Sequence, residues 1–321
     1  MTSMRTLSRG GEWRDRARNS GGTGIVAPRS GRGHSRHRLA LIFGDARTLL
    51  RAVTRQDAAA RIAGLLAELR AARDPAREPR NRLPRLAEVK QWQAERLALS
   101  FFDLTAKPRL AAASRFFLDD LYGAHDVAWR DRDIARMLPT LRSWLPSSVL
   151  RTVADALELD LLSHRLDLEL AESLTRDLEP GTALDQESYA AAYRDSSTRA
   201  ERKRQLTMLL RVGGDLDRIV QQPLVYTMLK IARGPANVAG LGQLQSFLER
   251  GFAAFRKMGD ATEFLVAIEA RESEAMRRLF EGKPDPFSLG PRTTARRPAR
   301  PPARNPAARR GGARSRARSG T

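Results

Sequence analysis

Two carboxylates and one imidazole share a face of one expected helix, residues 147–176. Asp160, His164 and Asp167 are four and three residues apart, a spacing that stacks side chains on one side of an α-helix. Their neighbours on that side are apolar, as at Leu157 and Leu168, and a charge in such surroundings is costly unless it is paired. The opposite, charged face is expected to meet solvent, and it comprises Arg151, Asp155, Glu158, Arg165, Glu169 and Glu172.

Two interpretations of Asp160, His164 and Asp167 follow. The functional one is a partial metal site or a His–Asp pair for acid–base catalysis, because both chemistries need an imidazole beside carboxylates. The structural one is a polar network between helices, with an arginine or a backbone group opposite, since structural ion pairs also bring charges inside proteins. We favour the structural interpretation and keep the functional one open.

A second group of chemically active side chains forms the run FFLDDLY, which consists of Phe116, Phe117, Leu118, Asp119, Asp120, Leu121 and Tyr122. It closes an expected helix at 109–122, and Gly123 is suited to the left-handed residue that ends a helix. Adjacent carboxylates beside a tyrosine could bind a cation or a basic partner. The alternative is a core helix whose acids pair with arginine or cap a neighbouring helix.

This run resembles the signature of the bacterial FFLEELY-motif proteins, with Asp119 and Asp120 in place of the two glutamates. The substitution keeps both charges and shortens their reach. The resemblance extends over roughly residues 85–280, and the Arg- and Leu-containing stretch 150–157 is part of it. It implies a helical domain and carries no catalytic residues.

Common catalytic signatures are missing from the sequence. It has no phosphate-binding G-x-x-x-x-G-K-[ST], no G-x-G-x-x-G after a strand, no G-x-S-x-G and no H-E-x-x-H. It also has no cysteine, which excludes disulfides, thiol catalysis and cysteine-ligated metals. These features lower the expectation of an enzyme, and we predict no cofactor.

The net charge of +20 is concentrated at the two ends of the chain. Residues 1–38 hold nine arginines and two acids, and residues 290–321 hold ten arginines and no acid. The 251 residues between them are close to neutral. Both ends are poor in apolar residues, so we expect disorder at 1–38 and at 284–321. Such tails could attach to nucleic acid without sequence preference, although GC-rich coding also produces arginine-rich tails.

Apolar periodicity predicts an all-α protein with one multi-helix domain of orthogonal or bundle-like packing. An amphipathic helix is expected at 45–73, followed by a proline-containing linker at 74–83 and the helical domain at 84–281. Proline and glycine divide that domain into eight expected helices. They are 85–106, 109–122, 130–145, 147–176, 185–195, 198–221, 224–233 and 241–280, with a break in the last at Gly259.

The sequence thus predicts a cytoplasmic protein without a membrane span, because no window approaches eighteen consecutive apolar residues. The expected function is that of a non-enzymatic helical interaction or scaffold protein. Its partner would be an unidentified protein or a second copy of the chain. The alternatives are a metal-binding or acid–base domain that uses Asp160, His164 and Asp167, and nonspecific nucleic-acid association through the tails.

Overall fold

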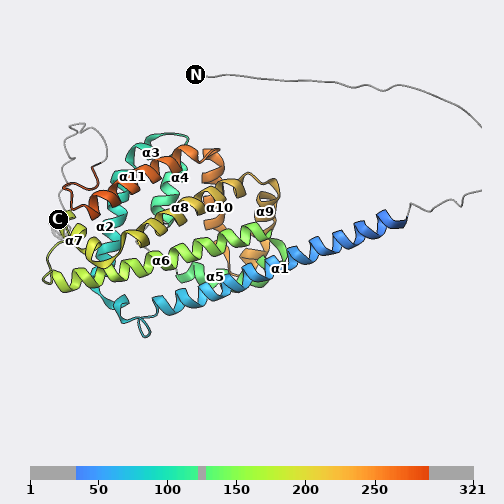
Figure 1. Cartoon of the computed structure of the whole chain (residues 1–321), viewed down its shortest axis with the longest axis horizontal. Helices are drawn as coiled ribbons and strands as arrows, with labels where there is room; N and C mark the ends of the chain where they lie inside the picture. The colour runs from blue at the N-terminus through green and yellow to red at the C-terminus, as the bar shows by residue number, and fades with distance from the viewer. Residues whose placement is uncertain (1–33, 122–127, 289–321) are drawn as a thin grey trace, which may run out of the picture. The chain divides into compact units, whose positions relative to one another are not determined.

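The computed structural model describes residues 34–121 and 128–288, and its elements in these ranges are all helices (Figure 1). The all-α prediction is therefore confirmed for the described chain. Contacts divide the chain into two units, Met1–Leu50 and Arg51–Thr321. The first unit contributes the first stretch of α1, and the second holds the other described elements. Both predicted basic tails lie outside the described residues, apart from 34–38 and 284–288.

The first helix, α1, spans His34–Arg73, so it begins before residue 45, where the sequence predicted its start. Its end at Arg73 agrees with the stop predicted from Asp74-Pro75.

The buried apolar face of α1 lies in its second half. Ile62, Leu66 and Leu69 are buried, whereas Val53 is 55% exposed. Nine residues separate Val53 from Ile62, and at 100° per residue this places them on opposite sides of the helix. Val53 therefore does not share the buried face of the helix predicted at 45–73.

A short 3-10 helix, η1 (Pro79–Arg82), occupies the predicted linker and leads into α2 (Pro84–Ser100). The single helix predicted at 85–106 is broken at Phe101, where the backbone leaves helical geometry, and resumes as α3 (Phe102–Ala106). The helix predicted at 109–122 is instead a short α4 (Ala111–Arg115) followed by the π-helix η2 (Phe116–Leu121).

The middle of the chain follows its sequence signals closely. It forms α5 (Ala128–Trp144), α6 (Ser147–Asp177), α7 (Gln186–Ser196) and α8 (Arg199–Val220). The Asp185 side chain caps α7 by accepting from the Ser188 amide, and Thr198 with Glu201 forms a reciprocal capping box at α8. Such caps satisfy amides that have no partner inside the helix.

The last three helices are α9 (Pro223–Val238), α10 (Gly242–Met258) and α11 (Thr262–Phe280). Gly259 ends α10 with a φ of 79°, which is where the sequence predicted a break. α9 continues past Gly234-Pro235, although its end was predicted at residue 233. Pro235 lies inside α9, where it has no backbone N–H to donate to the carbonyl of Ile231.

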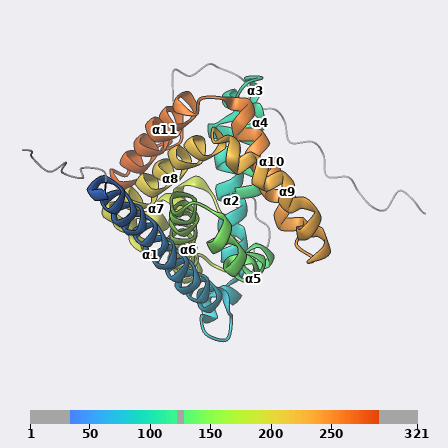
Figure 2. The ribbon, with the colours of Figure 1, turned by 90° about the vertical axis from the view of Figure 1, so that its right-hand side faces the viewer.

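α6 is the central helix of the second unit, and it packs against α2, α7 and α8. The apolar residues of α1 from Ala58 to Leu69 pack on Leu150, Ala154, Leu157 and Leu161 of α6, and Figure 2 shows these two helices side by side. A second apolar cluster joins η2, α10 and α11, and a third joins α2, α6 and α7. Among the described helices, none combines the length and the apolar character needed to cross a membrane.

Candidate functional sites

Asp160 on α6 is held by two arginines from neighbouring elements. Arg73 Nη2, at the end of α1, lies 2.8 Å from both carboxylate oxygens, and Arg130 Nη2 of α5 lies 2.7 Å from Oδ2. Arg73 also pairs with Asp131 of α5. Each of these side chains is at most about a quarter exposed. The Asp160 carboxylate therefore joins α1, α5 and α6.

His164 lies one turn further along α6 and meets a backbone group instead of a carboxylate. Its Nε2 is 3.1 Å from the Ala72 carbonyl oxygen, and because a carbonyl only accepts, Nε2–H is the donor. Burial lowers the pKa of His164 to about 4, and the positive charges of Lys90 and Arg73 act in the same direction. The ring is thus neutral at pH 7 and fixes the end of α1.

Asp167, almost one turn further, faces α2 and α8. Burial raises the pKa of its carboxyl, while Lys90, Arg202 and a hydrogen bond from Gln93 oppose that effect. Arg202 of α8 is itself only 5% exposed. Its Nε donates to Ser197 Oγ at 2.9 Å, and its guanidinium lies 4.3 Å from the centroid of the Tyr193 ring.

Asp160, His164 and Asp167 share one face of α6, yet each has different partners. Within residues 34–121 and 128–288, no group of three or more carboxylate or imidazole side chains could hold a metal ion. Guanidinium groups on Asp160 and a carbonyl on His164 are the partners that the structural interpretation requires. The sequence did not identify Gln93 and Arg202, because neither belongs to a recognisable motif and each comes from a different helix.

The FFLDDLY run directs its two phenylalanines into the core. The Phe116 ring lies 5.3 Å from that of Phe247 on α10, and the Phe117 ring meets Phe264 of α11 edge-on at 5.8 Å. A β-carbon added to Gly251 of α10 would lie 2.6 Å from Phe116 Cζ. Gly251 therefore lets η2 approach α10 closely.

The two aspartates of the FFLDDLY run have different environments. Asp120 accepts from Arg250 Nη2 of α10 at 2.5 Å, whereas Asp119 is exposed. Leu118 is partly buried against the same cluster as the phenylalanines, and Leu121 is exposed. Tyr122 lies outside the described residues. The arrangement attaches η2 to α10.

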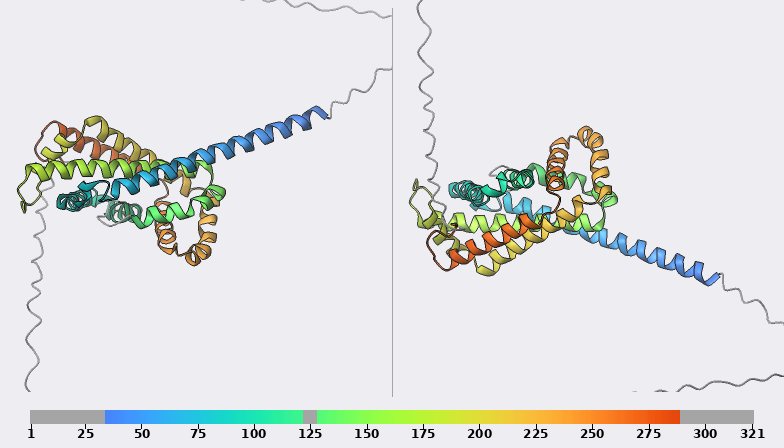
Figure 3. Two further views of the ribbon diagram at one scale, coloured as in Figure 1. Left: turned by 90° about the horizontal axis from the view of Figure 1, so that it is seen from below. Right: turned by 90° about the horizontal axis from the view of Figure 1, so that it is seen from above.

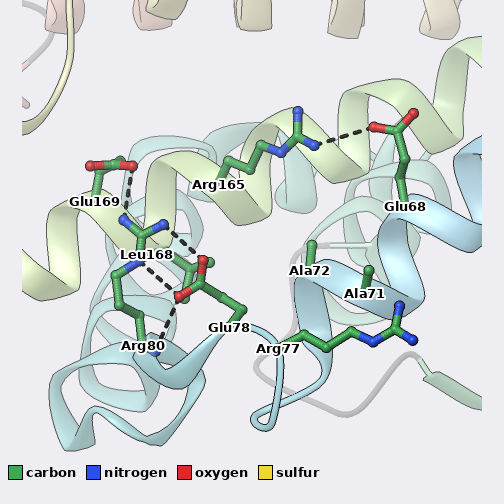
Figure 4. A pocket seen from close by; sticks show the side chains of 9 residues that line it. All are labelled: Glu68, Ala71, Ala72, Arg77, Glu78, Arg80, Arg165, Leu168 and Glu169. Carbon is green, nitrogen blue, oxygen red and sulfur yellow. Dashed lines mark hydrogen bonds and ion pairs between the residues drawn. The ribbon is translucent and has the colours of Figure 1, made fainter.

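A surface cleft of about 340 Å³ lies between α1, η1 and α6 (Figure 4). Its charged groups are largely paired with one another. Arg80 binds Glu78 and Glu169, and Arg165 binds Glu68. The paired charges leave little unsatisfied chemistry for a ligand.

A smaller cleft, of about 200 Å³, lies between α1, α6 and α8. Asp155, predicted on the solvent face of α6, is buried there, with Arg61 and Arg211 at 2.6 and 3.0 Å from its oxygens. The prediction fails because α1 and α8 cover this part of α6, which periodicity on one helix cannot show.

The outer face of α9 is apolar and has no partner in the described chain. Leu224, Ile231 and Val238 are 61%, 62% and 93% exposed. They are seven residues apart, so they form one line along the helix. Figure 3 shows α9 and α10, in gold and orange, as a helical pair at one edge of the second unit.

A scan against protein-family models matches residues 72–286, more than half of the 321 residues. A search of the curated proteins and a search of the solved structures each found no match. The match begins in the last turn of α1 and includes α6 and α9, so Asp160, His164, Asp167 and the α9 face all fall inside it. The chain therefore belongs to the family described as Domain of unknown function (DUF8198).

Proposed function

We propose that this chain is a non-enzymatic helical interaction protein, and that it self-associates through the outer face of α9. The observation that carries the proposal is the exposure of Leu224, Ile231 and Val238 on one helix face. Burying a large aliphatic side chain that was exposed to water stabilises a contact by about 1.5–3 kcal/mol. A continuous line of them on a surface is typical of a protein contact.

The spacing of this face fits a second copy of the same helix. In an antiparallel pair with a two-fold axis at Ile231, that residue meets its own counterpart, and Leu224 meets Val238 of the second copy. A two-fold contact requires such self-complementarity, because one patch serves both partners. Gly234, on the flank of this line, has open space around its α-carbon, so a second helix can approach there.

Charge permits a second copy at this position. The positions between the three aliphatic residues on this face are Thr227, Met228 and Pro235, none of which is charged. Two copies can therefore bury this face without bringing like charges together.

The contact is small, which predicts a weak dimer. Stable interfaces use about 20–30 residues a side, whereas α9 has 16 residues in total. We therefore expect an equilibrium between monomer and dimer that depends on protein concentration, and not a permanent assembly.

Sedimentation equilibrium of the full chain over a range of concentrations tests this proposal. The unmodified chain should approach twice the monomer mass as concentration rises, and Ile231→Glu should remain monomeric. Val266→Glu is the matched control, because Val266 on α11 is also exposed and should tolerate the charge. A monomer at every concentration, or equal effects of both substitutions, would contradict self-association through α9.

Three finer predictions from the sequence remain proposals. The run Phe116–Tyr122 supports a relationship to the FFLEELY-motif proteins. The arginine-rich ends support nonspecific association with nucleic acid. The absence of an apolar span in the sequence supports a cytoplasmic location. The contacts of Asp160 and His164 give no support to the metal-binding or acid–base alternative.

A further inference from the structure

Two positive charges lie over the ring of Tyr226 on α9. The Lys230 ammonium nitrogen and the Arg256 guanidinium carbon, from α9 and α10, are each 4.4 Å from the centroid of its ring. The Phe252 ring stacks on Tyr226 with a centroid separation of 5.3 Å and an interplanar angle of 21°. The tyrosine is half-buried, while both cations are exposed.

The charge around this tyrosine is not balanced by the described chain. Arg233, two turns further along α9 than Tyr226, is neutralised by two contacts to Glu249 at 2.8 and 2.7 Å. Lys230 and Arg256 form no ion pair with a described carboxylate. Because both lie 4.4 Å from one centroid, they are separated by at most twice that distance. Like charges at this separation repel each other weakly in water, and an anion bound to both would relieve that repulsion.

The three side chains together provide the donors of an oxyanion site. A guanidinium donates through a planar fork, an ammonium donates as a compact point charge, and a phenol donates one O–H. A hydrogen bond with Lys230, assisted by the charges of Arg256 and Arg233, lowers the pKa of Tyr226. A more acidic phenol is a stronger donor to an anion.

We propose that Tyr226, Lys230 and Arg256 bind a phosphate group. Two cations match the charge of a phosphate dianion better than that of a carboxylate, and three donors can each serve a different oxygen. The site is open to solvent, so the group can be a free ion or the end of a larger molecule.

This site is separate from the proposed dimer contact. Tyr226 is five residues before Ile231, which places it about 140° around α9 from that residue. A partner on the outer face of α9 would leave Lys230 and Arg256 accessible. Phosphate binding therefore goes beyond the proposed function and stands or fails independently of it.

Calorimetric titration of the full chain with inorganic phosphate, at constant ionic strength in chloride, tests the proposal. Arg256→Gln and Lys230→Gln should each weaken binding about tenfold or more, because each removes a charged donor. Tyr226→Phe keeps the ring and its cation contacts but lacks the O–H, so a smaller, measurable loss is expected.

Two matched controls separate this site from the basic character of the chain. Lys203→Gln on α8 and Arg70→Gln on α1 remove exposed charges outside the cluster and should leave phosphate affinity unchanged. Unchanged affinity in Arg256→Gln and Lys230→Gln would overturn the proposal. Equal losses in the controls would overturn it too, because they would indicate nonspecific attraction.

Two more titrations test whether the phosphate group is what the site recognises. A nucleoside monophosphate should bind at least as tightly as inorganic phosphate and should lose the same factor in Arg256→Gln, if the phosphate group is what the site recognises. Acetate should bind much more weakly. Acetate binding as tight as that of phosphate would contradict recognition of a phosphate group.

Discussion

His164 shows why a titratable residue on an apolar face need not be catalytic. The ring is 5% exposed, it donates to the Ala72 carbonyl, and burial holds its pKa near 4. A neutral imidazole with its donor nitrogen engaged joins α6 to the end of α1. It contributes structure in the form that prevails at neutral pH.

This environment predicts an acid-sensitive fold. The pKa of His164 is about 4 in the folded protein and about 6.5 in an unfolded chain. Between these values the unfolded state binds more protons, so the free energy of unfolding falls as the pH decreases from about 6.5 to about 4. The loss should be about 3 kcal/mol, measured by urea unfolding at several pH values.

His164→Gln is the matched variant, because its amide can still donate to Ala72 without titrating. Between about pH 6.5 and about pH 4, its free energy of unfolding should fall by about 3 kcal/mol less than that of the unmodified chain. The raised pKa of Asp167 acts in the opposite direction in both proteins and cancels in the comparison. Parallel pH profiles for the two proteins would contradict the role of His164.

Gly251 sets the distance between η2 and α10. In Gly251→Ala the new β-carbon would lie 2.6 Å from Phe116 Cζ, closer than carbon atoms approach, so the buried ring must move. We expect the free energy of unfolding to fall by about 1–3 kcal/mol, measured by urea denaturation.

Gly214→Ala on α8 serves as the control, because no heavy atom lies within 4 Å of the added carbon. It should stabilise the helix by up to about 1 kcal/mol. Adding Phe116→Leu to Gly251→Ala should recover part of the loss if the ring is the obstacle. Equal effects of the two alanine substitutions would show that Phe116 and Gly251 do not limit the approach.

Periodicity within one helix shows which side chains share a face, but it does not show which side chains of other helices they contact. The 3.6-residue period places Asp160, His164 and Asp167 on a common face of α6. It could not identify Arg73, Arg130 or Ala72 as partners, because these residues belong to α1 and α5. Asp155 failed for the same reason, since its burial depends on helices that cover α6.

At the scale of elements, breaks at glycine and proline were readable from the sequence and local irregularity was not. Gly259 marks a helix end that the structure shows. The break at Phe101 and the π-helix at Phe116–Leu121 have no glycine or proline to announce them. π-helical turns are frequent at functional sites; here the turn lets two consecutive aromatic rings reach the core.

We infer that the second half of α1 is part of the folded domain, although most of it precedes the family match at residue 72. Ile62 is fully buried within the cluster formed with α6. Ile62→Ala should lower the free energy of unfolding by about 2–5 kcal/mol, measured by urea denaturation of the full chain.

Val53→Ala provides the matched control on the same helix. Val53 is exposed, so the change should stay within about 0.5 kcal/mol. If Ile62→Ala were as mild as Val53→Ala, the contact between α1 and α6 would make no contribution to stability, and the inferred extension of the domain would be wrong.

At the scale of the whole molecule, basic residues and exposed apolar residues lie in different parts of the chain. The basic residues are concentrated near the two ends of the sequence, whereas α9, inside the family domain, presents a charge-free line of aliphatic residues. The helical class of the domain followed from periodicity alone. The exposure of α9 did not, because an amphipathic pattern shows which face is apolar and not whether another element covers it.

The absence of cysteine allows the most direct test of self-association, which is cross-linking of single-cysteine variants under mild oxidation. A disulfide needs α-carbons about 4.4–6.8 Å apart, and an antiparallel pair centred on residue 231 brings those positions together. Ile231→Cys should form a covalent dimer, and Leu224→Cys mixed with Val238→Cys should cross-link as well. Val266→Cys should remain a monomer. Cross-linking of Ile231→Cys no faster than that of Val266→Cys would contradict the proposed contact.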